Sequence, residues 1–386
     1  MIYLDYQSTT PVDKRVLEKM LPYFSEKFAN VHSNHFFGEE VKDDVENARH
    51  EIAVTINAED KEIIFTSGAT ESNNIALKGI FNYYKNKKNH IISSTIEHKC
   101  VLESLKYLET NCNAEITLIN PDKNGIISPD KIEAAIKTNT LMISIMAVNN
   151  EIGTIQDLEA IGKIAKKYDV LFHSDAAQAI GKIDIDVKKF GIDLLSISGH
   201  KIYGPKGIGA LYVSTSPKRI RLVPLFSGGG QERNFRSGTL PVPLCVGIGE
   251  AIKIARSEMQ QDNENALNLR NLFLEILCKN LKGVHVNGSL EHRVPQNLNL
   301  AFEGIESESL IFALEDIALT SVSACSSEKL ESSYVLHAIG IPDELSHASF
   351  RISFGRFSTK DEVIYTADKI IKVVNNLRSI SPLWNN

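Results

Sequence analysis

Short apolar runs alternate with longer amphipathic stretches between about residue 60 and residue 215. Near-continuous apolar runs of this length are typical of strands buried on both faces of a parallel sheet. Two of the intervening stretches, residues 128–137 and 157–167, have the apolar spacing of helices. This alternation predicts a mostly parallel sheet with helices on both faces. The predicted strands are residues 62–66, 90–94, 141–148, 170–174 and 192–198.

The pattern changes after about residue 255. Residues 256–281 form a long charged amphipathic stretch, which we expect to be a helix leading into a second domain. That domain would contain strands at 296–302 and 350–354 and a helix near 307–316. A chain of 386 residues also exceeds the size at which a single core usually stops growing. We therefore predict a large α/β domain over residues 16–255 and a smaller domain formed by residues 1–15 and 256–386.

Composition and charge narrow the possible partners. The chain has 43% hydrophobic and 23% charged residues, which is ordinary for a globular protein. Its net charge of −6 gives no support for a nucleic-acid or anionic-membrane partner. No apolar run has the length of a membrane span, and the first residues lack the pattern of a signal peptide. Five cysteines without a C-x-x-C pair argue against disulfides or a thiolate zinc site, so we expect a cytoplasmic protein.

Polar residues follow five of the predicted strands at the point where each strand ends. The loop at residues 67–72, of sequence SGATES, has the small residues that let backbone amides approach a phosphate group at a helix start. His98, Asn150, Asp175 and Lys201 lie just after the other four strands. Taken singly, each also fits a helix cap, a turn or a solvated loop residue. Ligands of parallel sheets bind outside the carboxyl ends of the strands, so we expect these groups to meet at one site.

Lys201 is the most informative of these residues, because it lies in the run SGHKIYGPKG, where a strand gives way to a glycine- and proline-rich turn. A lysine at the end of a buried strand is able to act as an amine nucleophile when desolvation lowers its pKa, although most lysines are solvated. One cofactor, pyridoxal phosphate, accounts for all five strand ends. Its phosphate would lie in the small-residue loop with Ser198 and His200. Lys201 would form an imine with it, and Asp175 would keep its pyridine nitrogen protonated.

Two residues nearer the C-terminus are further candidates. Cys325 lies in the small, serine-rich run SVSACSSE, a better setting for a nucleophilic thiolate than the apolar or helical surroundings of the other four cysteines. A buried, inert cysteine is the alternative. Arg351 alternates with the apolar residues of its predicted strand. It is equally well explained as a clamp for a substrate carboxylate and as a surface arginine.

Several motifs together resemble those of a known family. They are YLDYQSTTP at residues 3–11, FTSGATES at 65–72, EHK at 97–99, VNNEIG at 148–153, SGHKIYGPKG at 198–207, RSGT at 236–239 and SACS at 323–326. On these motifs and Asp175, nearly the whole chain resembles the group I cysteine desulfurases of the NifS/IscS type, within the class V aminotransferase-like enzymes. The resemblance implies the α/β fold of fold-type I pyridoxal-phosphate enzymes, with a mostly parallel seven-stranded sheet, helices on both faces and a smaller α+β C-terminal domain.

The resemblance also implies roles for individual residues. Lys201 would hold the cofactor covalently, and His98 would stack on its ring and act in catalysis. Asp175 would contact the ring nitrogen, and Gln178 the phenolic oxygen. The partner subunit of a homodimer would contribute one of the residues that bind the phosphate. These phosphate-binding residues would be Ala69, Thr70, Ser198, His200 and, from the partner subunit, Thr239.

The implied reaction converts L-cysteine to L-alanine. Asn150 would contact both cofactor and substrate, and Arg351 would bind the substrate carboxylate. The thiolate of Cys325 would attack the substrate sulfur and carry it as a persulfide to an iron–sulfur scaffold or another acceptor protein. No intrinsic metal is expected, although Cys325 would transiently ligate an iron–sulfur cluster shared with the acceptor.

Two other functions stay open at the level of sequence. One is another pyridoxal-phosphate activity on the same fold, either an aminotransferase or a selenocysteine lyase. The other is a non-catalytic sulfur-transfer partner that kept the fold. Formation of alanine from cysteine without a keto acid would separate a desulfurase from an aminotransferase, whereas a colourless or inert protein would indicate the non-catalytic partner.

Overall fold

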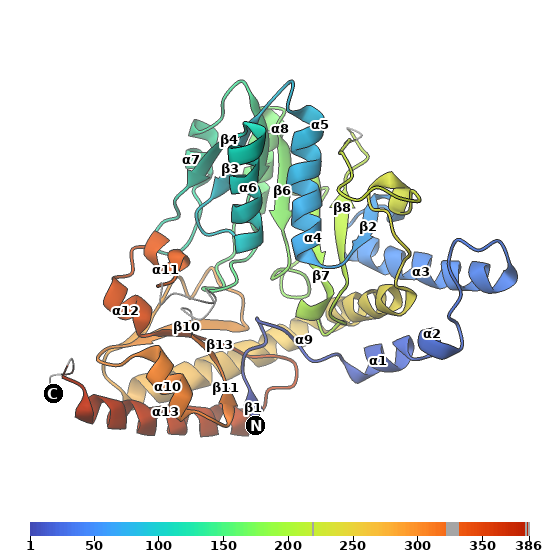
Figure 1. Cartoon of the computed structure of the whole chain (residues 1–386). Helices are drawn as coiled ribbons and strands as arrows, with labels where there is room; N and C mark the ends of the chain where they lie inside the picture. Colours follow the sequence, from blue (N-terminus) through green and yellow to red (C-terminus); the bar gives the residue numbers. More distant parts are fainter. Residues whose placement is uncertain (218–219, 322–331, 383, 385–386) are drawn as a thin grey trace.

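A seven-stranded sheet forms the centre of the larger part of the molecule (Figure 1). The computed structural model covers residues 1–386 and describes all of them except 218–219, 322–331, 383 and 385–386. Strand β8 is antiparallel to both of its neighbours, whereas the other neighbouring pairs are parallel, so the predicted sheet is confirmed. In spatial order the strands are β2 Ile63–Thr66, β8 Gly209–Val213, β7 Leu194–Ser198, β6 Leu171–Asp175, β5 Thr140–Ser144, β3 His90–Ser94 and β4 Glu115–Ile119.

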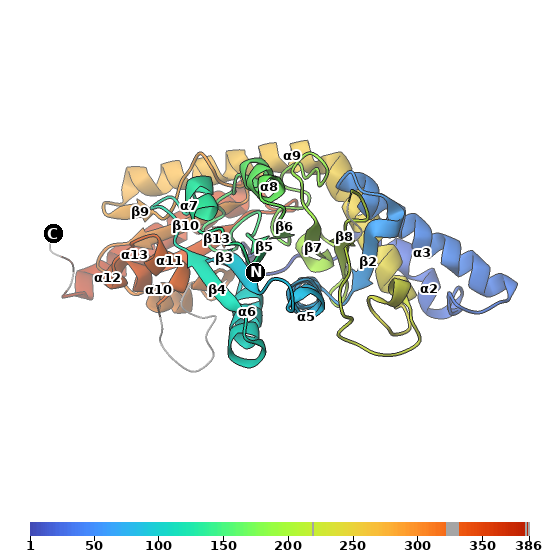
Figure 2. The ribbon, with the colours of Figure 1, turned by 90° about the horizontal axis from the view of Figure 1, so that it is seen from above.

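Helices cover both faces of this sheet, as predicted. Figure 2 shows α8 (Leu158–Lys167) and α9 (Val242–Asn280) on one face, and α5 (Ile80–Tyr84) and α6 (Lys99–Cys112) on the other. The remaining elements of this part are α1 Lys14–Met20, α2 Pro22–Ser25, α3 Phe36–Thr55, α4 Ala69–Asn74, α7 Pro129–Ala134, the π-helical turn Ile75–Gly79, and the 3-10 turns Asp60–Glu62, Gly199–Lys201 and Glu232–Asn234.

Separate apolar cores fill the two sides of the sheet. On one side, Ile161 of α8 and Ile248 of α9 belong to a core that includes Phe172 of β6. On the other side, Leu105 of α6 belongs to a core that includes Met142 of β5. Because both faces of the strands are buried, alternation of apolar and polar residues is absent and the strands appear in the sequence as continuous apolar runs.

The smaller part of the molecule is built around an antiparallel sheet with a core of its own. That core contains Phe273 of α9 together with Phe302, Phe350 and Phe354. The sheet order is β12 Thr320–Ser321, β13 Ser349–Ser353, β10 Asn297–Phe302 and β9 Val284–Val286. The chain start joins this part, because β1 Ile2–Tyr3 pairs in parallel with β11 Ile317–Ala318. The helices here are α10 Ser307–Ala313, α11 Tyr334–Ala338, α12 Asp343–His347 and α13 Lys360–Ile380.

Helix α9 links the two parts and is longer than its sequence pattern predicts. The expected helix began at residue 256, whereas the observed helix begins at Val242 and runs for 39 residues. Its first half is small and apolar rather than amphipathic because it is buried against α3. A Cβ at Gly249 would lie 2.5 Å from the Cβ of Ala48, so glycine permits this close approach. The domain boundary placed between residues 255 and 256 falls inside this continuous helix and stays a prediction.

Two further expectations differ from the structure. The strand predicted at 141–148 ends at Ser144, and Ile145–Val148 continues as a buried non-strand segment towards the turn at Asn149. Strand β4 was not predicted, because it is partly exposed at the edge of the sheet and lacks a continuous apolar run. Within the described residues, no helix is long and apolar enough to cross a membrane.

Candidate active site

A cleft of about 660 Å³ opens at the carboxyl ends of the parallel strands, where ligands of open parallel sheets bind. The structure brings ten of the predicted site residues together there, although they come from six separate segments of the chain. The ten residues that line the cleft are Ala69, Thr70, His98, Asn150, Asp175, Gln178, Ser198, His200, Lys201 and Arg351. Their individual roles stay predictions.

Two predicted site residues are not among those that line this cleft. Thr239 is exposed in the loop after Glu232–Asn234. Its absence from the cleft of its own chain is compatible with a role in a second subunit. Cys325 lies outside the described residues.

Lys201 is anchored by the amino-terminal segment. It follows β7 in a 3-10 turn, and its Nζ donates to the carbonyl oxygens of Gln7 at 2.6 Å and Ser8 at 2.7 Å. The solvated-loop explanation is therefore wrong, because the amine is held at the cleft by two acceptors. Gln7 and Ser8 were not singled out as site residues, although both lie in the motif at residues 3–11.

Asp175 is a buried carboxylate at the end of β6, where it is 5% exposed. Its Oδ2 accepts from Nδ2 of Asn73 at 2.7 Å, and its Oδ1 accepts from the backbone N–H of Ala177 at 2.9 Å. These neutral donors satisfy a buried acid while leaving its charge available for a cationic ligand. Asn73 lies within a helical segment, so nothing in the sequence marked it as a partner of Asp175.

His98 is both a helix cap and a residue of the cleft. Its Nδ1 accepts from the backbone N–H of Cys100 at 3.2 Å, which caps α6. Burial in the surrounding protein lowers the pKa of His98 below its usual 6.5, and nearby Lys201 and Lys99 lower that pKa further, whereas Asp175 acts to raise it. A neutral ring that accepts at Nδ1 carries its proton on Nε2. The sequence left a helix cap and a site residue as alternative explanations of His98. The structure is compatible with both at once.

The small-residue loop between β2 and α4 is open on the side that faces the cleft. A Cβ at Gly68 would meet nothing within 4 Å, whereas a Cβ at the adjacent Gly209 would lie 2.6 Å from the Cα of Gly68. The backbone N–H of Ser67 donates to Oε2 of Glu71 at 2.7 Å, and Glu71 forms an ion pair with Arg236 at 2.8 Å. These contacts fix the start of the helical segment and leave room for an anion in front of the loop.

His200 lies beside this loop as a neutral group. Burial, with the nearby Lys201 and Lys206, lowers the pKa of His200 to about 4. Its Nδ1 is 3.1 Å from Oγ1 of Thr9, which fixes the orientation of the ring. A neutral imidazole is suited to hydrogen-bonding a phosphate without adding charge.

Arg351 is buried beside Asn150, so the surface-arginine explanation is wrong. Its exposed fraction is 7%, and its two terminal nitrogens donate to Asn150 O at 2.8 Å, Asp5 Oδ1 at 2.7 Å and Ser8 Oγ at 2.5 Å. Arg351 Nε and Asn150 Oδ1 have no hydrogen-bond partner in the described structure. Unpaired buried polar atoms in a cleft point to a ligand that satisfies them.

Gln178 is held from two sides. Its Nε2 donates to Gln7 O at 2.9 Å, and its Oε1 accepts from Nζ of Lys182 at 2.7 Å. Lys182 was not predicted as a site residue, because a lysine beyond a glycine in a turn gives no sign in the sequence of being buried.

The residues of the cleft fit pyridoxal phosphate. An open small-residue loop with a neutral histidine suits the phosphate, a carboxylate held by neutral donors suits a pyridinium, and Lys201 supplies the amine. The volume of the cleft also lies within the range of cofactor pockets, about 300–1,000 Å³.

Comparison with known proteins decides the family. The model of the aminotransferase class-V family matches residues 2–365. The cysteine desulfurase IscS of Ehrlichia chaffeensis is 52% identical over 384 residues, which cover 99% of this chain and 93% of that protein. The chain belongs to this family, among the cysteine desulfurases. The IscS protein of Rickettsia rickettsii is 54% identical with the same coverage.

Solved structures agree with this assignment. A NifS-like protein superposes with a TM-score of 0.91 at 35% identity, covering 97% of this chain and 99% of that chain. SspA in complex with cysteine superposes with a TM-score of 0.83 at 40% identity, covering 93% of this chain and 100% of that chain. The fold expected from the sequence is confirmed, and the class V cysteine desulfurases are enzymes that depend on pyridoxal phosphate.

Proposed function

We propose that this chain converts L-cysteine to L-alanine and transfers the sulfur atom to the thiol of Cys325. The C–S bond of the substrate breaks, an S–S bond forms at Cys325, and the proton of that thiol is balanced by the hydrogen that the alanine methyl group gains. The observation that supports this most strongly is the meeting of Lys201, Asp175 and Arg351 at one cleft on the carboxyl edge of the sheet.

Pyridoxal phosphate, when bound, supplies an electron sink for the negative charge that develops at the substrate α-carbon. The residues of the chain orient the reactants around it. Arg351, held by Asp5 and Ser8, would receive the substrate carboxylate, with Asn150 beside it. A guanidinium binds a carboxylate through two parallel hydrogen bonds and so fixes its orientation as well as its position.

We assign the proton transfers of the reaction to Lys201 and His98. The Nζ of Lys201 is the base that we assign to the α-proton, because it is fixed at the cleft by the carbonyls of Gln7 and Ser8. His98 presents Nε2–H, since its Nδ1 is occupied by the backbone of Cys100. The carboxylate of Asp175, which Asn73 holds, would pair with the ring nitrogen of the cofactor.

The functional unit that we propose is a homodimer. Four phenylalanines around α2 and the start of α3 are more than half exposed, at the end of the molecule away from the smaller part (Figure 1). Exposed apolar groups gathered at one place favour a protein contact. Thr239, which does not line the cleft of its own chain, would then contribute to the cleft of the second copy. The four residues are Phe24, Phe28, Phe36 and Phe37.

The remaining partners follow from the chemistry of a protein-bound persulfide. We propose that Cys325 passes its sulfur to an iron–sulfur scaffold or another acceptor protein in the cytoplasm. A net charge of −6 favours a protein acceptor over direct contact with nucleic acid.

The test is a reaction of purified enzyme with L-cysteine and no keto acid. We expect alanine and one added sulfur atom on the protein, located at Cys325 by peptide mass spectrometry. The alternative activities predict other outcomes: an aminotransferase would need the keto acid, and a selenocysteine lyase would turn over selenocysteine but not cysteine. A colourless protein that fails to release alanine would overturn the proposal.

A further inference from the structure

Lys182 is a buried amine directly behind the cofactor cleft. It follows the turn that leads from β6 past Gln178, and it is 8% exposed. Its Nζ donates to Oε1 of Gln178 at 2.7 Å, and no carboxylate of the described residues lies within ion-pair distance of it. A buried amine without an acidic partner is costly, which indicates a purpose other than stability.

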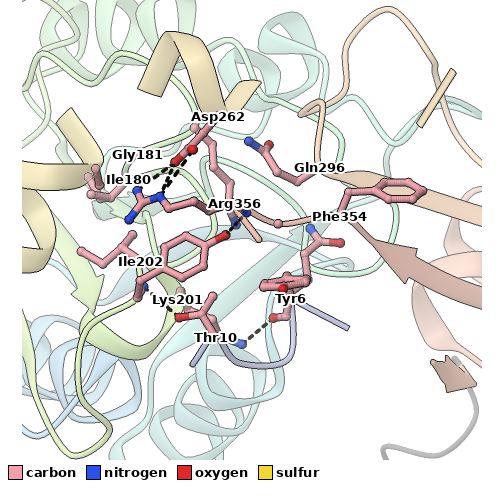
Figure 3. Close-up of a pocket in the computed structure, with 15 residues that line it drawn as sticks. Tyr6, Thr10, Ile180, Gly181, Lys201, Ile202, Asp262, Gln296, Phe354 and Arg356 are labelled. Atoms are coloured by element: carbon pink, nitrogen blue, oxygen red, sulfur yellow. Dashed lines mark hydrogen bonds and ion pairs between the residues drawn. The ribbon is translucent and has the colours of Figure 1, made fainter. Parts of the chain in front are cut away.

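In the part of the chain that the structure describes, no unpaired carboxylate lies on the cavity beside Lys182. Lys182 lines this small cavity of about 30 Å³, shared with Lys201 and shown in Figure 3. Among the described residues that line this cavity, one carries a carboxylate, Asp262, and it is bound by Arg356 at 2.8 Å. Burial lowers the pKa of Lys182 to about 7, and the positive charges of Lys201 and Arg351 contribute to this decrease in the pKa. The other ionisable side chains on the cavity are Tyr6 and Tyr203.

The two ends of the Gln178 side chain have partners of opposite type. The Nζ of Lys182 donates to the amide oxygen, and the carbonyl of Gln7 only accepts, so it requires the amide NH₂. Both contacts therefore favour the same orientation of the Gln178 side-chain amide. One N–H of the amide is used by Gln7, and the second is left for the cleft that Gln178 lines. Without Lys182, the carbonyl of Gln7 alone would hold that orientation.

We propose that Lys182 is a positioning residue of this site, which holds the side-chain amide of Gln178 so that its free N–H points to the phenolic oxygen of the bound cofactor. This inference rests on the proposed function, because the contact between Gln178 and that oxygen is part of it. Lys182 touches neither cofactor nor substrate and acts through Gln178.

The experiment is a pH titration of the visible absorbance of the holoenzyme. An N–H donated to the phenolic oxygen withdraws electron density from it, so the Schiff base of Lys201 releases its proton at lower pH. Lys182→Met, which removes the donor at nearly equal length, should raise the midpoint of the titration by about 0.5–1 pH unit. Lys188→Met is the matched control, because Lys188 is an exposed lysine of the following segment, and it should leave the midpoint unchanged.

A double-mutant cycle separates positioning from a direct effect of charge. Gln178→Leu removes the proposed contact, and adding Lys182→Met to it should then give no further shift. An unchanged midpoint in Lys182→Met, or an equal shift in both backgrounds, would overturn the proposed role of Lys182. Should Lys182→Met fail to fold, Lys182→Leu gives the same comparison with a smaller side chain. Wild-type holoenzyme without visible absorbance would instead overturn the proposed function, and this role with it.

Discussion

Lys201 donates from Nζ to the carbonyl oxygen of Gln7 at 2.6 Å, across 194 positions of sequence. The amino-terminal segment thus reaches over the end of the sheet and fixes the amine at the cleft. The same carbonyl accepts from Gln178 at 2.9 Å, so one backbone oxygen orients two of the proposed cofactor-binding side chains. The position of the first residues in the smaller part of the molecule is therefore directly linked to the geometry of the site.

Lys201→Ala should abolish covalent attachment of the cofactor. We expect the visible absorbance of a protein-bound Schiff base to disappear and alanine formation to fall by about 10²–10⁴-fold, the usual loss when a general base is removed. Reduction with borohydride followed by peptide mapping checks the attachment point. Lys188→Ala, which alters an exposed lysine, should behave as the wild type. An unchanged spectrum in Lys201→Ala would exclude this lysine.

Cys325→Ser should separate cofactor chemistry from sulfur transfer. The variant is expected to keep the visible absorbance, because the proposed cofactor contacts lie elsewhere, and to lose the persulfide and transfer to an acceptor. Serine cannot carry a persulfide. Cys278→Ser changes an exposed free cysteine and should retain both properties. Full sulfur transfer by Cys325→Ser would be incompatible with the mechanism.

Arg351→Lys should weaken substrate binding more than turnover. An ammonium keeps the charge but loses the bidentate contact and the two-sided anchoring by Asp5 and Asn150. A charge-assisted hydrogen bond contributes about 1.5–3 kcal/mol, so KM for L-cysteine should rise about 10- to 150-fold. Steady-state kinetics over a range of L-cysteine concentrations gives the answer, with Arg256→Lys on the exposed side of α9 as the control. A KM equal to that of the wild type would argue against a carboxylate clamp.

Arg49→Met should destabilise the fold next to the small-residue loop. Arg49 forms a bidentate ion pair with Glu232, at 2.8 and 2.9 Å, and Glu232 also accepts from the backbone N–H of Phe65 in β2. Breaking a buried pair from one side costs about 3–5 kcal/mol, because the other charge remains buried. Chemical denaturation measures the loss. Arg256→Met breaks an ion pair with Glu51 that is more exposed, and should cost about 0–1 kcal/mol.

The lowered pKa of Lys182 predicts that the free energy of unfolding of this protein depends on pH. Its folded pKa of about 7 lies below the unfolded value of 10.5, so the unfolded state binds more protons between these values and wild-type stability gains from rising pH there. Below pH 7 the amine is protonated in both the folded and the unfolded state, so the full free-energy cost of burying its charge is present. Lys182→Met removes it, so the variant should exceed the wild type in thermal stability most at pH 6, and less at pH 9.5. A difference that does not change with pH would contradict the lowered pKa.

The motifs proposed to carry the chemistry could be recognised in the sequence, because each has a distinctive pattern of neighbouring residues. A strand followed by a small-residue loop, or by the run that contains Lys201, has a recognisable pattern wherever it occurs. Asp175 was found for the same reason, since an acid directly after an apolar strand is unusual. The positions of β2, β3, β5, β6 and β7 follow from the same apolar runs.

The sequence did not reveal the burial of these residues or the side chains from distant segments that hydrogen-bond to them. Asn73 lies within a helix, and only the packing of α4 against the sheet brings it to Asp175. The pattern around Arg351 left two explanations open, and burial of both faces of β13 excluded the surface arginine. Lys182 looked like any lysine of a turn until the structure showed it buried against Gln178.

The sequence by itself determined the family, the cofactor and the residue types at the strand ends, because these depend on local pattern and on motifs of fixed spacing. Only the tertiary structure decided which backbone carbonyls hold Lys201, which neutral donors satisfy Asp175, and which amine orients Gln178. The physical reason is that hydrogen-bond partners and burial depend on distances in space. Chain folding sets these distances between segments that are far apart in the sequence.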